Sequence, residues 1–171
     1  ALHKIMVNIW REGRIPDSWR DAIILPLHKK GTVTSVENYR GISLLRTTFK
    51  LLERIILRRI INAREETARE EQCGFRPGRG TRDQIFTLRR IIEMHHESAQ
   101  PLHVAFLDFA SAFDSPTRDR LFEAIHADGM PPKILQLIQD MNTRTGASVK
   151  SPMGLSEKFA VETGVRQGAV L

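Results

Sequence analysis

The sequence predicts an α+β fold in which long helices pack on a small antiparallel sheet. Apolar residues recur at helical spacing between residues 44 and 68, which is typical of an amphipathic helix. A consecutive apolar run at 102–107 is typical of a buried strand, and shorter segments elsewhere indicate further strands. The chain has 171 residues and is 41% hydrophobic, so one core of this mixed kind is expected.

The N-terminal part predicts a helix followed by a hairpin. Residues 1–12 form the expected helix, which ends at a glycine. Residues 21–27 have the composition of a strand. Pro26 cannot donate a hydrogen bond to a neighbouring strand, so an edge or a bulge is expected there. A basic turn at 28–32 and a returning strand at 37–42 complete the hairpin.

Two long helices are expected next. Ser43 is a good N-cap for a helix over 44–68. Thr81 and Gln84 have the spacing of a capping box for a second helix, which runs to about residue 98. The apolar residues expected on the buried face of this second helix are Ile85, Leu88, Ile91 and Ile92.

The C-terminal part is expected to mix strands and helices. Ser115 followed by Pro116 is the pattern of an N-cap with proline at the first helical position. The expected elements are, in order, a strand at 102–107, a helix from Ser115 to about 128, a helix from Pro131 to about 141, and strands at 147–150 and 158–162.

Positive charge is concentrated in the first part of the chain. The formal net charge is +6; residues 1–100 carry 19 Lys and Arg against 12 Asp and Glu, and residues 101–171 carry 7 against 8. This distribution is typical of a protein in which one part binds phosphates, although a solvated surface explains it equally well. No apolar stretch has the length of a membrane helix, so no membrane partner is expected. The single cysteine, Cys73, excludes an internal disulfide and a cysteine-built metal site.

Several residues near the C-terminus have both a structural and a functional interpretation. Asp108 lies in an apolar run, where an ionised carboxylate needs water, an arginine or a cation; for a lone aspartate, an ion pair or a strand end is the ordinary explanation. Asp114 precedes the predicted helix start and is assigned to capping. Phe113 by itself is more typical of a core than of a substrate contact. Gly164 and Gly168 flank a polar pair and mark a turn that another group approaches closely.

Two basic segments are candidates for phosphate binding. Lys29, Lys30 and Arg40 lie at or after the tip of the expected hairpin, where they either converge on phosphates or solubilise the loop. A glycine-rich loop suits a nucleic-acid backbone and is equally compatible with an ordinary exposed turn. The basic residues of this loop are Arg76, Arg79 and Arg82.

The order of these features is more specific than any one of them. In that order, the chain resembles the reverse transcriptase domain of non-LTR (LINE-type) retrotransposons from about residue 10 to its end. The six blocks that carry the resemblance are Ile15–Arg20, Pro26–Gly31, Asn38–Leu45, Gln72–Thr81, Phe106–Ser115 (FLDFASAFDS) and Gly164–Gly168 (GVRQG). The resemblance implies a right-hand polymerase, with fingers and fingers–palm helices in residues 1–100 and a partial palm in 101–171.

The resemblance implies roles for five residues of the palm. Asp108 is similar to the carboxylate that binds both catalytic Mg²⁺ ions, with the backbone carbonyl of Phe109 beside it and Mn²⁺ as an alternative ion. Two-metal phosphoryl transfer requires oxygen ligands of this kind. Phe113 is similar to the steric gate that excludes a 2′-hydroxyl group. Gln167, with Gly168, is similar to the residue that packs on the incoming nucleotide.

The resemblance also implies contacts and partners for the basic part. Arg40 and one of Lys29 or Lys30 are similar to the fingers residues that contact the triphosphate, and Arg166 is a weaker candidate to support this site. The implied partners are an RNA template, a DNA primer and deoxynucleoside triphosphates, with no membrane. The implied location is the nucleus, with a cytoplasmic phase as a ribonucleoprotein.

The sequence departs from the family pattern in ways that affect activity. Ser111 and Ala169 stand where the family often has Lys and Cys, and neither change removes a reacting group. The Asp-Asp pair that the family's metal site needs is absent. The chain starts at Ala1 and ends on an apolar run at Leu171, so we expect a segment of a longer polymerase that is inactive alone.

Two other interpretations remain open at this point. The first is a decayed or domesticated fragment that binds RNA through its basic part and catalyses nothing. The second is a basic helical protein-interaction module, which is the weaker alternative because it leaves the contexts of Asp108 and Gln167 unexplained.

Overall fold

The structure is a computed structural model that describes residues 1–171 apart from the side chain of Asn62. The chain divides into two compact units. The first unit combines residues 1–61 with residues 111–171, and the second unit consists of residues 62–110. The assignment of residues 1–100 to fingers and 101–171 to palm stays a prediction.

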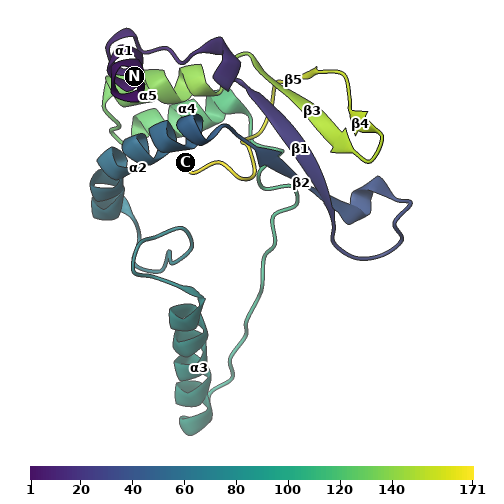
Figure 1. Ribbon diagram of the computed structural model, residues 1–171. Helices are drawn as coiled ribbons and strands as arrows, with labels where there is room; N and C mark the ends of the chain where they lie inside the picture. The colour runs from purple at the N-terminus through teal and green to yellow at the C-terminus, as the bar shows by residue number, and fades with distance from the viewer. The chain divides into compact units, whose positions relative to one another are not determined.

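The first unit contains a small mixed sheet (Figure 1). Its strands are β1 (Asp21–His28), β2 (Tyr39–Leu44), β3 (Thr145–Ser151), β4 (Gly154–Leu155) and β5 (Phe159–Val161). The strand order is β2-β1-β3-β4, and β5 also pairs with β3. β1 and β2 form the predicted antiparallel hairpin, whereas β1 and β3 are parallel. The prediction of an antiparallel sheet was therefore wrong for this pair. Helices separate β2 from β3 in the sequence, and β3 then pairs with β1. Parallel neighbouring strands require a long crossover connection of this kind.

At Pro26, β1 pairs with only one neighbouring strand. β1 pairs with β3 only between Asp21 and Ile24, while its pairing with β2 continues to His28. Pro26 is opposite Gly41 of β2. The expectation of a local edge at Pro26 is confirmed, because proline is tolerated where one side of the strand is unpaired.

Four helices belong wholly or mainly to the first unit. They are α1 (Leu2–Glu12), α2 (Thr47–Thr67, which continues into the second unit), α4 (Arg118–Ala127) and α5 (Pro132–Met141). Short 3₁₀ turns occupy Asp17–Trp19 and Val36–Asn38. Among the residues that the structure describes, no helix is long and apolar enough to cross a membrane.

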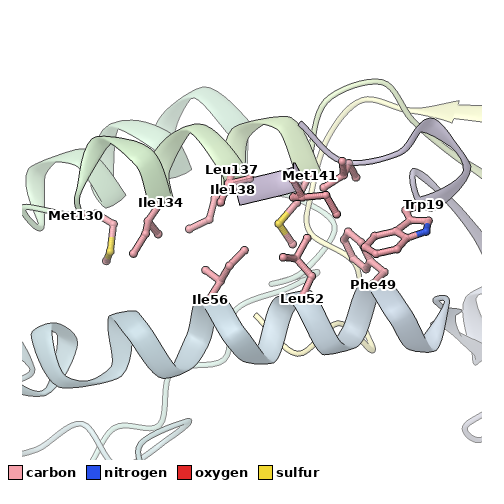
Figure 2. Close-up of a cluster of buried hydrophobic side chains, with 11 residues drawn as sticks. Trp19, Phe49, Leu52, Ile56, Met130, Ile134, Leu137, Ile138 and Met141 are labelled. Carbon is pink, nitrogen blue, oxygen red and sulfur yellow. The ribbon is translucent and has the colours of Figure 1, made fainter. Parts of the chain in front are cut away.

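The hydrophobic core lies between α2 and α5 (Figure 2). From α2, the side chains that enter it are Phe49, Leu52 and Ile56, at the i, i+3, i+7 spacing of one helix face. From α5 they are Ile134, Leu137, Ile138 and Met141. The Trp19 ring meets Phe49 edge-on, with 6.3 Å between ring centroids. Leu137 is fully buried, which stabilises the fold by about 1.5–3 kcal/mol relative to exposure.

Two predicted helix starts were wrong, and hydrogen bonding explains both. α2 begins at Thr47 because the preceding residues belong to β2, where Leu44 lies opposite Ile23. α4 begins at Arg118, with Thr117 as the N-cap, rather than at Ser115. The carbonyl of Pro116 accepts a hydrogen bond from the amide of the distant Gly164 (2.9 Å). Residues 115–117 therefore make a tertiary contact and do not form the first turn of the helix.

The second unit contains α3 (Thr81–Glu97). The capping box is displaced by one residue from its predicted position: the carboxylate of Asp83 accepts a bond from the Gly80 amide (2.7 Å). Ile85, Ile91 and Ile92, expected to be buried, are exposed. None of the described residues of the second unit buries these side chains.

The strand predicted at 102–107 is also absent. Residues 101–109 have no strand pairing, and Phe106 and Leu107 are exposed. The apolar run signals a buried strand, but a strand forms only with a hydrogen-bonding neighbour, and none of the described residues provides one.

Candidate functional site

A cavity of about 250 Å³ lies in the first unit between the sheet and the 164–168 turn. β1 and β2 contribute Ala22, Ile24, Gly41 and Ser43 to its wall. The polar side chains that line it come from other elements: Asp114, Arg118, Thr145, Arg166 and Gln167. A mixed wall of this kind can hold part of a ligand that has both apolar and polar faces.

The 164–168 turn is fixed to the rest of the first unit by its backbone. The Val165 amide donates to the Phe113 carbonyl (2.7 Å), and the Ser43 amide donates to the Gln167 carbonyl (2.8 Å). Gly164 has a φ of 71°, and a Cβ atom at this position would lie 2.6 Å from the Phe113 carbonyl oxygen. The prediction that another group approaches this turn closely is confirmed at Gly164.

Arg118 joins four elements at the wall of the cavity. Its guanidinium donates to the Gly164 carbonyl (3.2 Å), to the Asn142 carbonyl after α5, and to the Thr145 hydroxyl of β3 (3.0 Å). The Thr145 hydroxyl in turn donates to the Val161 carbonyl of β5 (2.8 Å). Burial lowers the pKa of Arg118. The residue holds the turn against the sheet and the two helices.

Arg166 and Glu53 attach the end of the turn to α2 and α5. The Arg166 guanidinium lies 4.8 Å from the Phe49 ring centroid and donates to the Met141 carbonyl. The Glu53 carboxylate is almost fully buried and accepts a bond from the Val170 amide (2.9 Å). Burial raises the pKa of Glu53, while the Val170 amide and the Arg166 charge oppose that rise.

The structure brings two of the predicted nucleotide-binding segments together. Phe113 is bonded through its carbonyl to the turn that carries Gln167 and Gly168. Gly168 has a φ of 112°, and a Cβ atom there would lie 2.8 Å from the Ser43 carbonyl oxygen. Phe113 and Gln167 come from sequence blocks about 50 residues apart, so their proximity depends on tertiary structure.

The predicted triphosphate contacts lie away from this cavity. Lys29 and Lys30 are at the exposed tip of the β1–β2 hairpin. Arg40 lies opposite Leu27 on β2 and is exposed. Because side chains alternate along a strand, Arg40 is on the sheet face opposite to Gly41, which lines the cavity. Their roles stay predictions.

Asp108 and Phe109 belong to the second unit, in the segment without strand pairing. Both residues are exposed. Among the described residues there is no group of three or more His, Cys, Asp or Glu side chains that is able to hold a metal ion. The donor set for a metal is therefore incomplete within this part of the protein, and the metal role of Asp108 stays a prediction.

Two arginines of the arginine-rich loop in the second unit are paired with acidic side chains. Arg76 is almost fully buried and forms ion pairs with Glu65 (2.7 Å) and Glu70 (3.4 Å). Arg79 also pairs with Glu70. Hydrogen bonding to these carboxylates raises the pKa of both arginines. Arg82 is exposed and has no ion pair in the described structure. Nucleic-acid binding by this loop stays a prediction, but two of its three arginines hold the loop closed.

Sequence reasoning misjudged Asp114 and missed Arg118. Asp114 does not cap α4, since that helix starts at Arg118 and its N-cap makes no side-chain bond; instead, it lines the cavity. A signal for Arg118 was present in the sequence. An arginine in the first turn of a helix opposes the helix dipole, so its position there calls for another explanation.

Comparison with known proteins identifies the family. The profile of reverse transcriptase (RNA-dependent DNA polymerase) matches residues 27–171. The chain belongs to the reverse transcriptase family. The resemblance to non-LTR reverse transcriptases that the motifs indicated is thereby confirmed. The mixed α/β fold is consistent with part of a polymerase.

The related proteins belong to mobile elements. The chain is 31% identical to the RNA-directed DNA polymerase from mobile element jockey of Drosophila melanogaster, over 99% of the chain and 19% of the relative. It is 28% identical to a 149 kDa protein of transposon TX1 from Xenopus laevis, over 99% of the chain and 13% of the relative. A third relative is the Pol polyprotein from type-2 retrotransposable element R2DM of Drosophila melanogaster, 27% identical over 96% of the chain and 15% of the relative. The chain thus spans less than a fifth of the length of these relatives.

Proposed function

We propose that this reverse transcriptase chain is part of an RNA-directed DNA polymerase that extends a DNA primer on an RNA template. The observation that carries the proposal is the backbone attachment of the Gln167 turn to Phe113 and Ser43. It joins three separate blocks of the sequence at one cavity. The match of the family profile to residues 27–171 supports the same class of reaction.

In this proposal the cavity residues, together with Phe113 on the segment bonded to the 164–168 turn, select and orient the incoming nucleotide. The Phe113 ring excludes a 2′-hydroxyl group, and Gln167 packs on the nucleotide at the glycine turn. Arg118 acts as a positioning residue, since it bonds to the Gly164 carbonyl at the start of the same turn. The triphosphate contacts that the resemblance assigns to Arg40 and to Lys29 or Lys30 lie away from this cavity and stay predictions. Selection in such a site depends on keeping the contacting groups in place, which the backbone bonds at the turn favour.

Reverse transcriptases generally use divalent metal ions, and we propose Mg²⁺ for this one, with Mn²⁺ as a substitute and two ions in the complete enzyme. Asp108 and the Phe109 carbonyl supply oxygen ligands of the kind that Mg²⁺ prefers. They do not complete a site by themselves, as the described residues include no group of three metal-ligating side chains. We therefore expect purified residues 1–171 to be inactive in primer extension.

The proposed partners are an RNA template, a DNA primer and deoxynucleoside triphosphates. The proposed place of work is the nucleus, with a cytoplasmic phase as a ribonucleoprotein, because retrotransposition inserts the product into chromosomal DNA. The relatives named after mobile elements support this setting.

The test is primer extension by a polymerase in which this segment is completed by the rest of its polypeptide. Asp108→Asn is nearly isosteric and removes the charge that a metal ion requires, so we expect extension to be lost while folding is retained. Asp119→Asn, an exposed aspartate of α4, is the matched control and is expected to retain activity. Full activity of Asp108→Asn would refute the assigned role. A completed polymerase with no activity at all would favour the alternative of a non-catalytic RNA-binding fragment.

A further inference from the structure

A row of basic side chains follows one side of α2, away from the core. Lys50, Arg54 and Arg58 are four residues apart, so they lie on one face of the helix. The three residues are called the α2 basic row below. Phe49, Leu52 and Ile56 point from the other side of the same helix toward α5 (Figure 2). The α2 basic row therefore lies on a helix whose orientation within the first unit is fixed by the hydrophobic core.

Within the part of the chain that the structure describes, the cations of the α2 basic row form no ion pair. Arg54 and Arg58 are exposed and form no ion pair among the side chains that the structure describes. Glu53 is an acidic neighbour of Lys50, but its carboxylate is almost fully buried and bonded to the Val170 amide. Many of the other arginines form ion pairs. Those in ion pairs are Arg11, Arg20, Arg76, Arg79, Arg89, Arg90, Arg120 and Arg144.

The α2 basic row reduces the stability of the helix that carries it. Like charges four residues apart on a helix repel each other by about 0.2–0.5 kcal/mol per pair. Lys50 lies in the first turn of α2, which has no acidic residue, and a cation there opposes the helix dipole. Helix stability alone therefore favours acidic or neutral residues at these positions, and the observed charges point to a partner of opposite sign.

The spacing of the row fits a nucleic-acid backbone. Each step of four residues advances about 6 Å along the helix, so the row is about 12 Å long. A nucleic-acid strand in a duplex has one phosphate per about 3.4 Å of the duplex axis, so a row parallel to that axis spans three or four phosphates. We propose that the α2 basic row is a binding surface for the phosphate backbone of the nucleic acid on which this reverse transcriptase acts. The inference rests on the proposed function and names the surface that the function requires.

This proposal replaces the arginine-rich loop as the main phosphate-binding surface of residues 1–100. Arg76 and Arg79 would have to leave Glu65 and Glu70 before they contact a phosphate, whereas Arg54 and Arg58 have no such partner to lose. Point charges suffice for this task, because phosphate contacts position a nucleic acid without reading its bases.

The test measures how the affinity of the purified 171-residue chain depends on salt. The probes are a labelled single-stranded RNA and a labelled DNA duplex, and the variant is the triple Lys50→Gln, Arg54→Gln, Arg58→Gln. The slope of log K against log salt changes by about 0.7 for each phosphate contact on a single strand and by about 0.9 on a duplex. We expect the slope to become shallower by about 2 on RNA or by about 3 on DNA. The probe that shows its full expected change, while the slope on the other stays the same, identifies the nucleic acid that the row contacts.

The matched control removes three other arginines that are exposed and paired. The variant Arg89→Gln, Arg90→Gln, Arg120→Gln has the same net charge as the test variant, and its slope should equal that of the wild type. Arg54→Lys with Arg58→Lys should also keep the wild-type slope, since the charge is retained. Thermal unfolding of each variant checks that the fold is intact.

An unchanged slope in the test variant on both probes would overturn the proposal, as would an equal loss in the matched control. Binding of an acidic protein with no binding of either nucleic acid would also overturn it. These results are independent of the Asp108→Asn experiment. A failed polymerase assay with a flattened salt slope contradicts the proposed function alone, and an active polymerase with an unchanged slope contradicts the α2 basic row alone.

Discussion

The Val165 amide donates a 2.7 Å hydrogen bond to the Phe113 carbonyl and so attaches the 164–168 turn to the segment before α4. The two residues come from different sequence blocks of the reverse transcriptase pattern. Their bond means that a displacement of the turn also displaces the backbone of Phe113. The proposed selection of the sugar by Phe113 and the proposed packing on the nucleotide by Gln167 therefore depend on one structural unit.

Gly164→Ala is expected to destabilise the chain more than Gly129→Ala. Both glycines have a positive φ, 71° and 74°, so both substitutions bear the left-handed penalty of about 1–2 kcal/mol. Only Gly164 also faces a backbone atom, the Phe113 carbonyl oxygen, at 2.6 Å from a Cβ position. Urea unfolding of the two variants measures the difference. Equal losses would show that the close approach at Gly164 has no energetic consequence.

Arg118→Met is expected to loosen the turn. The substitution keeps much of the aliphatic volume and removes three charged hydrogen-bond donations, to Gly164, Asn142 and Thr145. We expect a loss of about 2 kcal/mol or more in the free energy of unfolding. Arg120→Met is the control, because Arg120 is exposed and its pair with Glu123 is worth little. In the completed polymerase, Arg118→Met should raise KM for nucleotides, and a KM equal to that of the wild type would contradict its positioning role.

Glu53→Gln is expected to remove a pH dependence of stability. Burial raises the pKa of Glu53 in the folded chain above its ordinary value of 4.5. The folded state thus holds this proton more tightly than the unfolded state does. The contribution of Glu53 is complete below about pH 4.5 and is lost as the pH rises through the raised pKa.

The wild type should therefore lose stability relative to Glu53→Gln as the pH rises above 4.5, by about 1.4 kcal/mol per pH unit at most. Unfolding in urea at a series of pH values measures the difference. Glu66→Gln, at an exposed glutamate of α2, is the control and should follow the wild type. Parallel curves for the wild type and Glu53→Gln would contradict the raised pKa.

Phe113→Ala in the completed polymerase is expected to admit ribonucleotides. Removal of the ring removes the group that the proposal assigns to contact with a 2′-hydroxyl, so the ratio of kcat/KM for ribonucleotides to that for deoxynucleotides should rise by more than about tenfold, or 1.4 kcal/mol. Phe86→Ala, at an exposed position of α3, provides the comparison. Selectivity that stays the same in both variants would exclude Phe113 as the gate.

Local patterns predicted some elements correctly and failed where tertiary contacts decide. α1, the β1–β2 hairpin and α5 depend on short-range periodicity and turn residues, and all were anticipated. The start of α2 was wrong because Leu44 belongs to β2, and the start of α4 was wrong because Pro116 bonds to the distant 164–168 turn. The parallel pairing of β1 with β3 was missed because no local signal specifies a partner so far along the chain.

For the candidate site too, local motifs predicted some residues correctly and missed features that depend on tertiary structure. Motif order indicated Phe113 and Gln167, and the structure joins their segments. The alternation of side chains that places Arg40 on the sheet face opposite to the cavity depends on the β1–β2 register. Motifs do not encode that register. The acidic partners of Arg76 and Arg79 were also invisible in a composition that showed only a basic loop.

The parallel pairing of β1 with β3 has a consequence for synthesis on the ribosome. Asp21 lies opposite Gly146, and Arg20 bonds to Asp140, so β1 has to wait for partners made more than 100 residues later. At 5–20 residues per second that delay is on the order of ten seconds. During it, one edge of the nascent hairpin is open to other chains. High contact order of this kind slows folding, so we expect the yield of soluble protein to improve at low temperature or with a chaperone that shields the edge.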